Sequence, residues 1–154
     1  MKKITPFLWF DTQAEEAMNF YVSIFKNAKV GGVSRGLDGR AFSVSFELDG
    51  QEFIGLNAGP QFKFNEAVSM FVNCEDQAEV DELWSKLIAD GGGESMCGWL
   101  KDKYGLSWQI IPKQLGELMG DPDSEKSQRV MQAMLKMRKI VVADLERAHK
   151  GGHG

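Results

Sequence analysis

Histidine is almost absent from this chain of 154 residues, and the two that occur, His149 and His153, both lie near the C-terminal end. A Ser–His or Cys–His nucleophile pair inside the folded body is therefore nearly excluded, and so is a histidine-rich metal centre. We interpret the terminal HKGGHG segment as a mobile tail. Delivery of a tail histidine to a partner subunit's site is the minor alternative.

Cysteine and long apolar runs are also scarce. Cys74 and Cys97 lack the short spacing of a metal-binding pair, and reduced thiols suit a cytoplasmic protein. No apolar run approaches the length of a transmembrane helix, and the short apolar N-terminus lacks the cleavage site of a secretion signal. We therefore expect a cytoplasmic chain without a membrane partner.

Basic charge is in the minority. The net charge is −4 and the isoelectric point is about 5.2, which argues against non-specific binding to nucleic acid. The apolar content of 43% and the charged content of 26% are ordinary for a globular protein. A chain of this length suits one domain or two small modules.

The first half of the chain predicts a strand, a helix and three more strands. Residues 4–10 form an apolar run that predicts a strand. Thr12 followed by Glu15 resembles a capping box that starts an amphipathic helix over Gln13–Phe25. A tight turn at Asp49-Gly50 then joins two of the strands.

That tight turn also sets a register. It places Phe46 opposite Phe53 and Glu47 opposite Glu52, and it puts Asn57 on the apolar face of the sheet. The first module then extends over residues 4–59.

The same order of elements repeats over residues 67–112. A strand at Ala67–Cys74 precedes a helix whose start is marked by Asp76 and Glu79. The glycine triplet at 91–93 follows that helix rather than opening one, so a helix stop is favoured over a phosphate-binding loop. The repeat predicts an α+β protein built from two βαβββ modules.

Leu106–Ile111 is predicted as the strand that closes the second module. Because side chains alternate along a strand, Trp108 points to one face and Gln109 to the other. Gln109 then lies either near solvent or at a polar position in a pocket.

The C-terminal part is expected to be one long helix over Glu125–His149, with a stripe that contains Met134 and Met137. The pattern leaves open whether this helix packs on its own domain or on a second subunit.

Several motifs are similar to one known family: ITPFLWFD, NFYVSIF, QEFIGLNAGP, SMFVNCEDQAEVDELW, WLKDKYGLSWQIIP and the tail DPDSEKSQRVMQAMLKM. On these motifs the chain resembles the vicinal oxygen chelate superfamily, which includes glyoxalase, bleomycin-resistance and extradiol dioxygenase proteins. It is most similar to the PhnB-like branch, often labelled 3-demethylubiquinone-9 3-methyltransferase. The resemblance implies that residues 1–120 form a single domain whose two modules make a cupped mixed sheet within a homodimer, and that a C-terminal helix and short tail occupy 121–154.

In metal-dependent members, four positions at the floor of the cup hold the ligands. The resemblance places them at Pro6, Asn57, Val68 or Ser69, and Gln109. These side chains are neutral or lack a donor, and divalent transition metals prefer imidazole, carboxylate or thiolate. We therefore expect no metal, and no cofactor either, because the chain shows no glycine-rich turn for S-adenosylmethionine.

We expect the ligand-binding residues to be Trp9, Asn57, Ser69, Trp99 and Gln109, with no catalytic residue assigned. The leading hypothesis is a metal-free, dimeric binding protein for a small molecule. The alternatives are a lyase or isomerase of the superfamily, a methyltransferase-like protein by family label alone, and a scaffold that acts through its C-terminal helix. For each tryptophan, packing in the core is the competing explanation.

Overall fold

The computed structural model describes residues 2–151. It divides into two compact units, Met1–Phe64 and Asn65–Gly154, and each is described by itself below. His153 lies outside the described residues.

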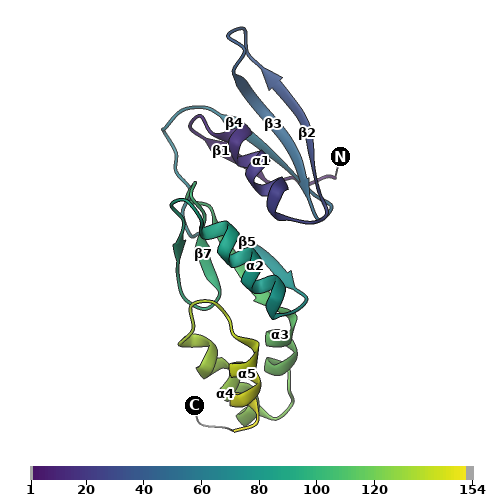
Figure 1. Cartoon of the computed structure of the whole chain (residues 1–154), viewed down its shortest axis with the longest axis vertical. Helices are drawn as coiled ribbons and strands as arrows, with labels where there is room; N and C mark the ends of the chain where they lie inside the picture. The colour runs from purple at the N-terminus through teal and green to yellow at the C-terminus, as the bar shows by residue number, and fades with distance from the viewer. Residues whose placement is uncertain (1, 152–154) are drawn as a thin grey trace. The chain divides into compact units, whose positions relative to one another are not determined.

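The first unit is one βαβββ module (Figure 1). Its elements are β1 (Phe7–Phe10), α1 (Ala14–Ile24), β2 (Ala28–Arg35), β3 (Ala41–Leu48) and β4 (Gln51–Asn57). The sheet has the order β1-β4-β3-β2, with β1 parallel to β4 and the other neighbours antiparallel. α1 covers one face of this sheet, and the apolar side chains between them are buried: Leu8, Phe10, Ala14, Ala17, Met18, Tyr21, Val44, Phe46 and Phe53.

The predicted hairpin is confirmed in its turn and in its register. Asp49 and Gly50 have positive φ angles of 49° and 79°, as a two-residue turn of this kind requires. Phe46 pairs with Phe53, and Glu47 pairs with Glu52.

The predicted start of α1 is wrong in its cap. Thr12 does not cap the helix, which begins at Ala14. The backbone N–H of Ala14 donates instead to Oδ1 of Asn57 at 2.8 Å, and Nδ2 of Asn57 donates to the backbone oxygen of Ala41 at 3.0 Å. Asn57 therefore serves the helix-covered side of the first sheet.

The second unit repeats the module. Its elements are β5 (Ser69–Cys74), α2 (Gln77–Ile88), β6 (Gly93–Glu94), β7 (Trp99–Lys101) and β8 (Ser107–Pro112), with the sheet order β5-β8-β7-β6. This order corresponds strand by strand to that of the first unit. The prediction of an α+β fold made of two βαβββ modules is confirmed.

The two predicted ends of α2 are also confirmed. The Asp76 carboxylate accepts a hydrogen bond from the backbone N–H of Glu79 at 2.9 Å, and the Glu79 carboxylate accepts one from that of Glu75 at 2.8 Å. At the other end, a Cβ on Gly92 would lie 2.6 Å from the backbone of Ile88. That glycine is required by the helix stop.

The prediction of a single long C-terminal helix is wrong. The structure has three helices after β8: α3 (Lys113–Met119), α4 (Ser124–Leu135) and α5 (Val142–His149), which Figure 1 shows grouped together at the C-terminal end of the second unit. Their buried residues form a cluster with the end of β8: Ile111, Leu115, Val130, Ile140 and Leu145. The C-terminal helices thus pack on the second module of their own chain.

Tertiary hydrogen bonds account for the break between α4 and α5. The backbone oxygens of Met137 and Arg138 accept hydrogen bonds from the N–H groups of Cys97 and Gly98, each at 2.8 Å. The side chain of Gln77 donates to the oxygen of Ile140 at 2.9 Å and accepts from the N–H of Val142 at 2.7 Å. These groups would be used inside a continuous helix, so the break depends on contacts that local sequence does not encode.

His149 belongs to this folded part rather than to a mobile tail. Its Nε2 lies 2.8 Å from Oδ2 of Asp121. The pKa of Asp121 is held below its usual value by the backbone N–H of Asp123 and by the hydrogen bond with His149.

The helices between residues 2 and 151 are all too short or too polar to span a lipid bilayer.

Candidate functional site

The sheet of the second module has one face against α2 and one face turned away from it, which we call the open face of module two. Trp99 on β7 and Phe71 on β5 are the direct neighbours of Gln109 on β8. Ser69 lies two residues before Phe71, so it has the same orientation. The open face of module two therefore brings together Ser69, Trp99 and Gln109, which the sequence had named separately.

The polar groups of this face are held by one hydrogen bond. Nε2 of Gln109 donates to Oγ of Ser69 at 2.9 Å, and both residues are half-buried. The pair leaves the carbonyl oxygen of Gln109 and the hydroxyl proton of Ser69 for a further partner.

Trp108 points to the other face, as the alternation predicted. Its side chain is buried, and its indole N–H donates to Oδ2 of Asp102 at 2.9 Å. Asp102 is itself buried, and its Oδ1 accepts hydrogen bonds from the N–H groups of Tyr104 and Leu106. This carboxylate is an internal anchor for the turn between β7 and β8.

Trp9 occupies the corresponding open face of module one, because Leu8 and Phe10 on either side of it are buried under α1. Its indole N–H donates to the backbone oxygen of Gly59 at 2.9 Å, and its ring meets Phe62 edge-on with centroids 4.9 Å apart. Asn57, the fifth predicted residue, does not lie on this face, because its amide is used beneath α1.

The sequence reasoning missed a cavity of about 560 Å³ at the end of module two where β7 turns into β8. Ser107, Trp99, Lys101 and Glu66 line it. The Ser107 side chain is on the open face, directly between Lys101 on β7 and Ser69 on β5. The strand alternation that identified Gln109 applies equally to Ser107, two residues earlier, and could have found it.

Ser107 is unusual because it is buried and its Oγ finds no hydrogen-bond partner among residues 2–151. Leaving a buried hydroxyl unsatisfied costs about 1–3 kcal/mol. Beside it, Lys101 forms an ion pair with Glu66, and the hydrogen bond from Lys101 lowers the pKa of Glu66. The cavity therefore offers one unsatisfied hydroxyl and one ion pair next to an indole ring.

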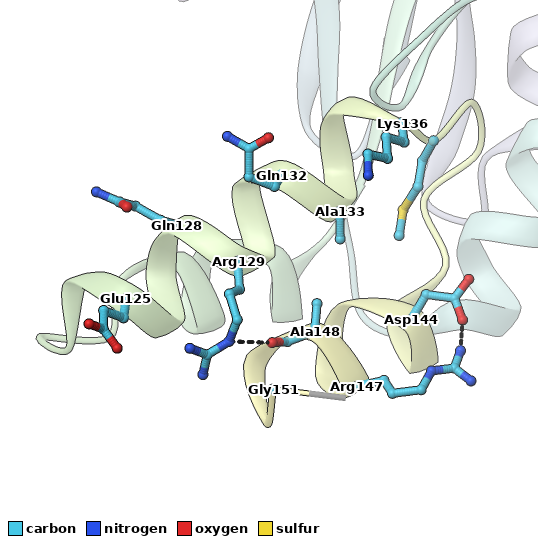
Figure 2. Close-up of a pocket in the computed structure, with 11 residues that line it drawn as sticks. Glu125, Gln128, Arg129, Gln132, Ala133, Lys136, Asp144, Arg147, Ala148 and Gly151 are labelled. Carbon is cyan, nitrogen blue, oxygen red and sulfur yellow. Dashed lines mark hydrogen bonds and ion pairs between the residues drawn. The ribbon is translucent and has the colours of Figure 1, made fainter. Parts of the chain in front are cut away.

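A second cavity, of about 820 Å³, lies between α4 and α5 (Figure 2). Its most buried cation already has partners, because Arg129 donates to the backbone oxygens of Ala148 and His149 at 2.9 Å. Arg147 forms an ion pair with Asp144 on the same helix. The hydrogen bonds of Arg129 join α4 to α5, so its guanidinium serves the packing of the two helices.

The comparison with known proteins matches residues 2–111 to the family model described as 3-demethylubiquinone-9 3-methyltransferase. The chain belongs to this family. The match places it in the vicinal oxygen chelate superfamily and confirms the resemblance drawn from the motifs. It ends within β8, so α3, α4 and α5 follow the part that the family model covers.

Solved structures support the same assignment. A PhnB protein from Bacillus cereus that carries the same methyltransferase label is 38% identical, with a TM-score of 0.68, and the match covers 72% of this chain and 99% of that one. A protein from Pseudomonas aeruginosa is 16% identical, with a TM-score of 0.60 and coverage of 73% and 98%, which shows the fold alone. No curated protein matches the chain.

A fosfomycin resistance protein from Listeria monocytogenes, solved with Mn(II) and sulfate, shares the fold at 16% identity and a TM-score of 0.51, over 70% of this chain and 90% of that one. The side chains of the present chain do not suit a divalent metal ion. Within module two, Ser69 and Gln109 offer only a hydroxyl and an amide, which bond to each other and are weak ligands for a divalent transition metal. Residues 2–151 also contain no group of three His, Cys, Asp or Glu side chains placed to hold a metal.

Proposed function

We propose that this family member is a dimeric small-molecule-binding protein whose ligand lies on the open face of module two. One observation supports this most directly: the Gln109–Ser69 pair stands beside Trp99 on a face that α2 does not cover. Aromatic rings with a few placed polar groups are the usual lining of a small-molecule site. Trp9, on β1, presents an aromatic ring on the corresponding face of module one.

The donor chemistry supports binding without a metal ion. An amide and a hydroxyl bind divalent transition metals weakly, but they hydrogen-bond well to carbonyl, hydroxyl or amide groups of a ligand. We therefore assign Ser69 and Gln109 to direct hydrogen bonding with the ligand.

A second copy of the chain is the proposed cover for exposed aromatic side chains. Phe7 is 58% exposed and Phe71 is 60% exposed, each on the open face of its own module. Exposed aromatic side chains on sheet faces that are turned away from the helices favour an interaction surface on each module. Sedimentation velocity should show a dimer, and a concentration-independent monomer would contradict this part of the proposal.

We place the protein in the cytoplasm, since both cysteines, Cys74 and Cys97, are free thiols.

The family label raises methyl transfer as the alternative. The turns from β1 to α1 and from β5 to α2 contain no glycine, which the cradle of a cofactor phosphate or sulfonium commonly uses. Titration with S-adenosylmethionine separates the two functions. Saturable binding with methyl transfer would favour the enzyme.

Ligand binding is tested by mass spectrometry of small molecules released from the purified protein, followed by calorimetric titration of each candidate. The Gln109→Ala variant should weaken binding about tenfold, because a hydrogen bond to the ligand and the position of Ser69 are both lost. Gln132→Ala, at an exposed position on α4, is the matched control. Equal binding by wild type and Gln109→Ala would place the ligand elsewhere.

A further inference from the structure

We propose that the cavity at the β7–β8 turn binds the carboxylate of a flat, apolar organic acid, held by Lys101 and Ser107 with the flat part against Trp99. This inference rests on the proposed function and names the class of ligand for that same face. It follows from three features of the cavity.

The first feature is the unsatisfied hydroxyl of Ser107. The residue is 1% exposed, lines the cavity, and its Oγ has no hydrogen-bond partner among the described residues. A hydroxyl can donate to a carboxylate oxygen, and such charge-assisted bonds are short and strong. A bound carboxylate would accept the hydrogen bond that the Ser107 hydroxyl does not make within the folded chain.

The second feature is the ammonium group of Lys101, whose present ion pair a ligand can replace with little loss of stability. Lys101 is the direct cross-strand neighbour of Ser107, and its ammonium pairs with Glu66. The two side chains are 47% and 59% exposed. Exposed ion pairs contribute little to stability, so an incoming carboxylate can replace Glu66 on Lys101.

The third feature is that the other carboxylates of the cavity already accept hydrogen bonds. Oε2 of Glu94 accepts from the indole N–H of Trp84 at 2.8 Å. Asp102 accepts from Trp108 and from two backbone N–H groups. These acids serve the fold, which leaves Glu66 as the acid that competes with the ligand.

Space for the flat part lies beside Trp99. Gly93, on the wall of the cavity, has no heavy atom within 4 Å of the place where a Cβ would stand. Gly93 pairs with Lys101, and Trp99 lies two residues before Lys101 on the same face of β7, so this space is next to the cation and within the cavity that the indole also lines. A planar ring that extends from a carboxylate on Lys101 towards the indole can stack there, which favours aromatic acids over aliphatic ones.

The test is calorimetric titration of the full chain with 2-naphthoate, its neutral amide 2-naphthamide, and acetate. We expect 2-naphthoate to bind at least about tenfold more tightly than either of the others, because only it offers both a charge and a ring. Lys101→Met and Ser107→Ala should each weaken 2-naphthoate about tenfold and leave 2-naphthamide little changed. Denaturant midpoints report whether each variant is folded.

Glu66→Gln gives the sharpest result. It removes the competing carboxylate, so 2-naphthoate should bind more tightly, by about threefold to tenfold. Glu75→Gln, which removes a similar exposed ion pair with Lys113, is the control and should change nothing.

Three results would overturn the carboxylate site. They are equal affinity for 2-naphthoate and 2-naphthamide, weaker binding of 2-naphthoate by Glu66→Gln, and no binding of 2-naphthoate by the wild type at millimolar concentration. If 2-naphthoate binding is lost in Gln109→Ala but unchanged in Lys101→Met and Ser107→Ala, the carboxylate site is refuted while the open face stands. The proposed function is refuted separately if the purified protein releases no small molecule and no candidate ligand binds in the titration.

Discussion

Gln109 donates a hydrogen bond from its side-chain amide to the hydroxyl oxygen of Ser69 at 2.9 Å, although the two residues are 40 positions apart in the chain. They stand on β8 and β5, which are hydrogen-bonded neighbours in one sheet. Sites built on strands hold their geometry better than sites built on loops. The pair is therefore an organised polar position next to the rings of Trp99 and Phe71.

Asn57 should contribute to stability through α1. Asn57→Ala removes the acceptor of the Ala14 N–H, so we expect a loss of about 0.5–2 kcal/mol in the free energy of unfolding, measured by denaturant titration. Asn57→Asp keeps the acceptor oxygen and should lose less. Thr12→Ala should leave the free energy of unfolding almost unchanged. A larger loss of stability from Thr12→Ala than from Asn57→Ala would show that Thr12, and not Asn57, caps α1.

The C-terminal helices should be needed for the stability of module two. Ile140 is fully buried in the cluster with Ile111 and Leu145, so Ile140→Ala should cost about 2–5 kcal/mol. Leu135→Ala, at a position that is 49% exposed, is the control and should cost far less. Truncation after Gly120 removes Ile140 and Leu145 together, so we expect the truncated chain to unfold at a lower temperature. An unchanged melting temperature would show that these helices are an accessory to the fold.

The two cysteines should react very differently. Burial, with the negative charge of Glu79 nearby, raises the pKa of the Cys74 thiol from 9.0 to about 12. Cys97 is partly exposed. Iodoacetamide at pH 8 should modify Cys97 in the native protein and leave Cys74 unmodified, as peptide mass mapping can show. Modification of Cys74 before Cys97 would contradict the structure.

The same shift predicts a loss of stability at high pH. The folded protein holds the thiol proton more tightly than the unfolded chain, so the contribution of Cys74 is complete below pH 9 and is lost as pH rises towards 12. The free energy of unfolding of the wild type should therefore fall more steeply over this range than that of Cys74→Ala. Parallel slopes for the two proteins would contradict the raised pKa.

Local patterns predicted the fold well wherever the interaction itself is local. The Asp49-Gly50 turn and the Asp76–Glu79 cap lie within a few residues of what they organise, and both are as predicted. The cap of α1 failed because its acceptor, Asn57, is 43 positions away from Ala14. The continuous C-terminal helix failed because Gln77 binds backbone groups more than 60 positions away.

The candidate site shows the same division. Strand alternation was enough to place Gln109 and Trp108 on opposite faces. Counting ligand positions from the family put Asn57 at the cup, whereas the hairpin register had already put it on the apolar face, which is where it lies. The cavity beside Ser107 is partly formed by the ion pair between Glu66 and Lys101. No local sequence pattern predicts this pair, because the two residues are far apart in the chain.

Calorimetric titration of the ligand released from the purified protein, with Gln109→Ala beside the wild type, is the direct test of binding at the open face of module two. We predict saturable binding to metal-free wild-type protein and about tenfold weaker binding to Gln109→Ala. Binding that requires an added divalent metal, or that is equal in the two proteins, would contradict it.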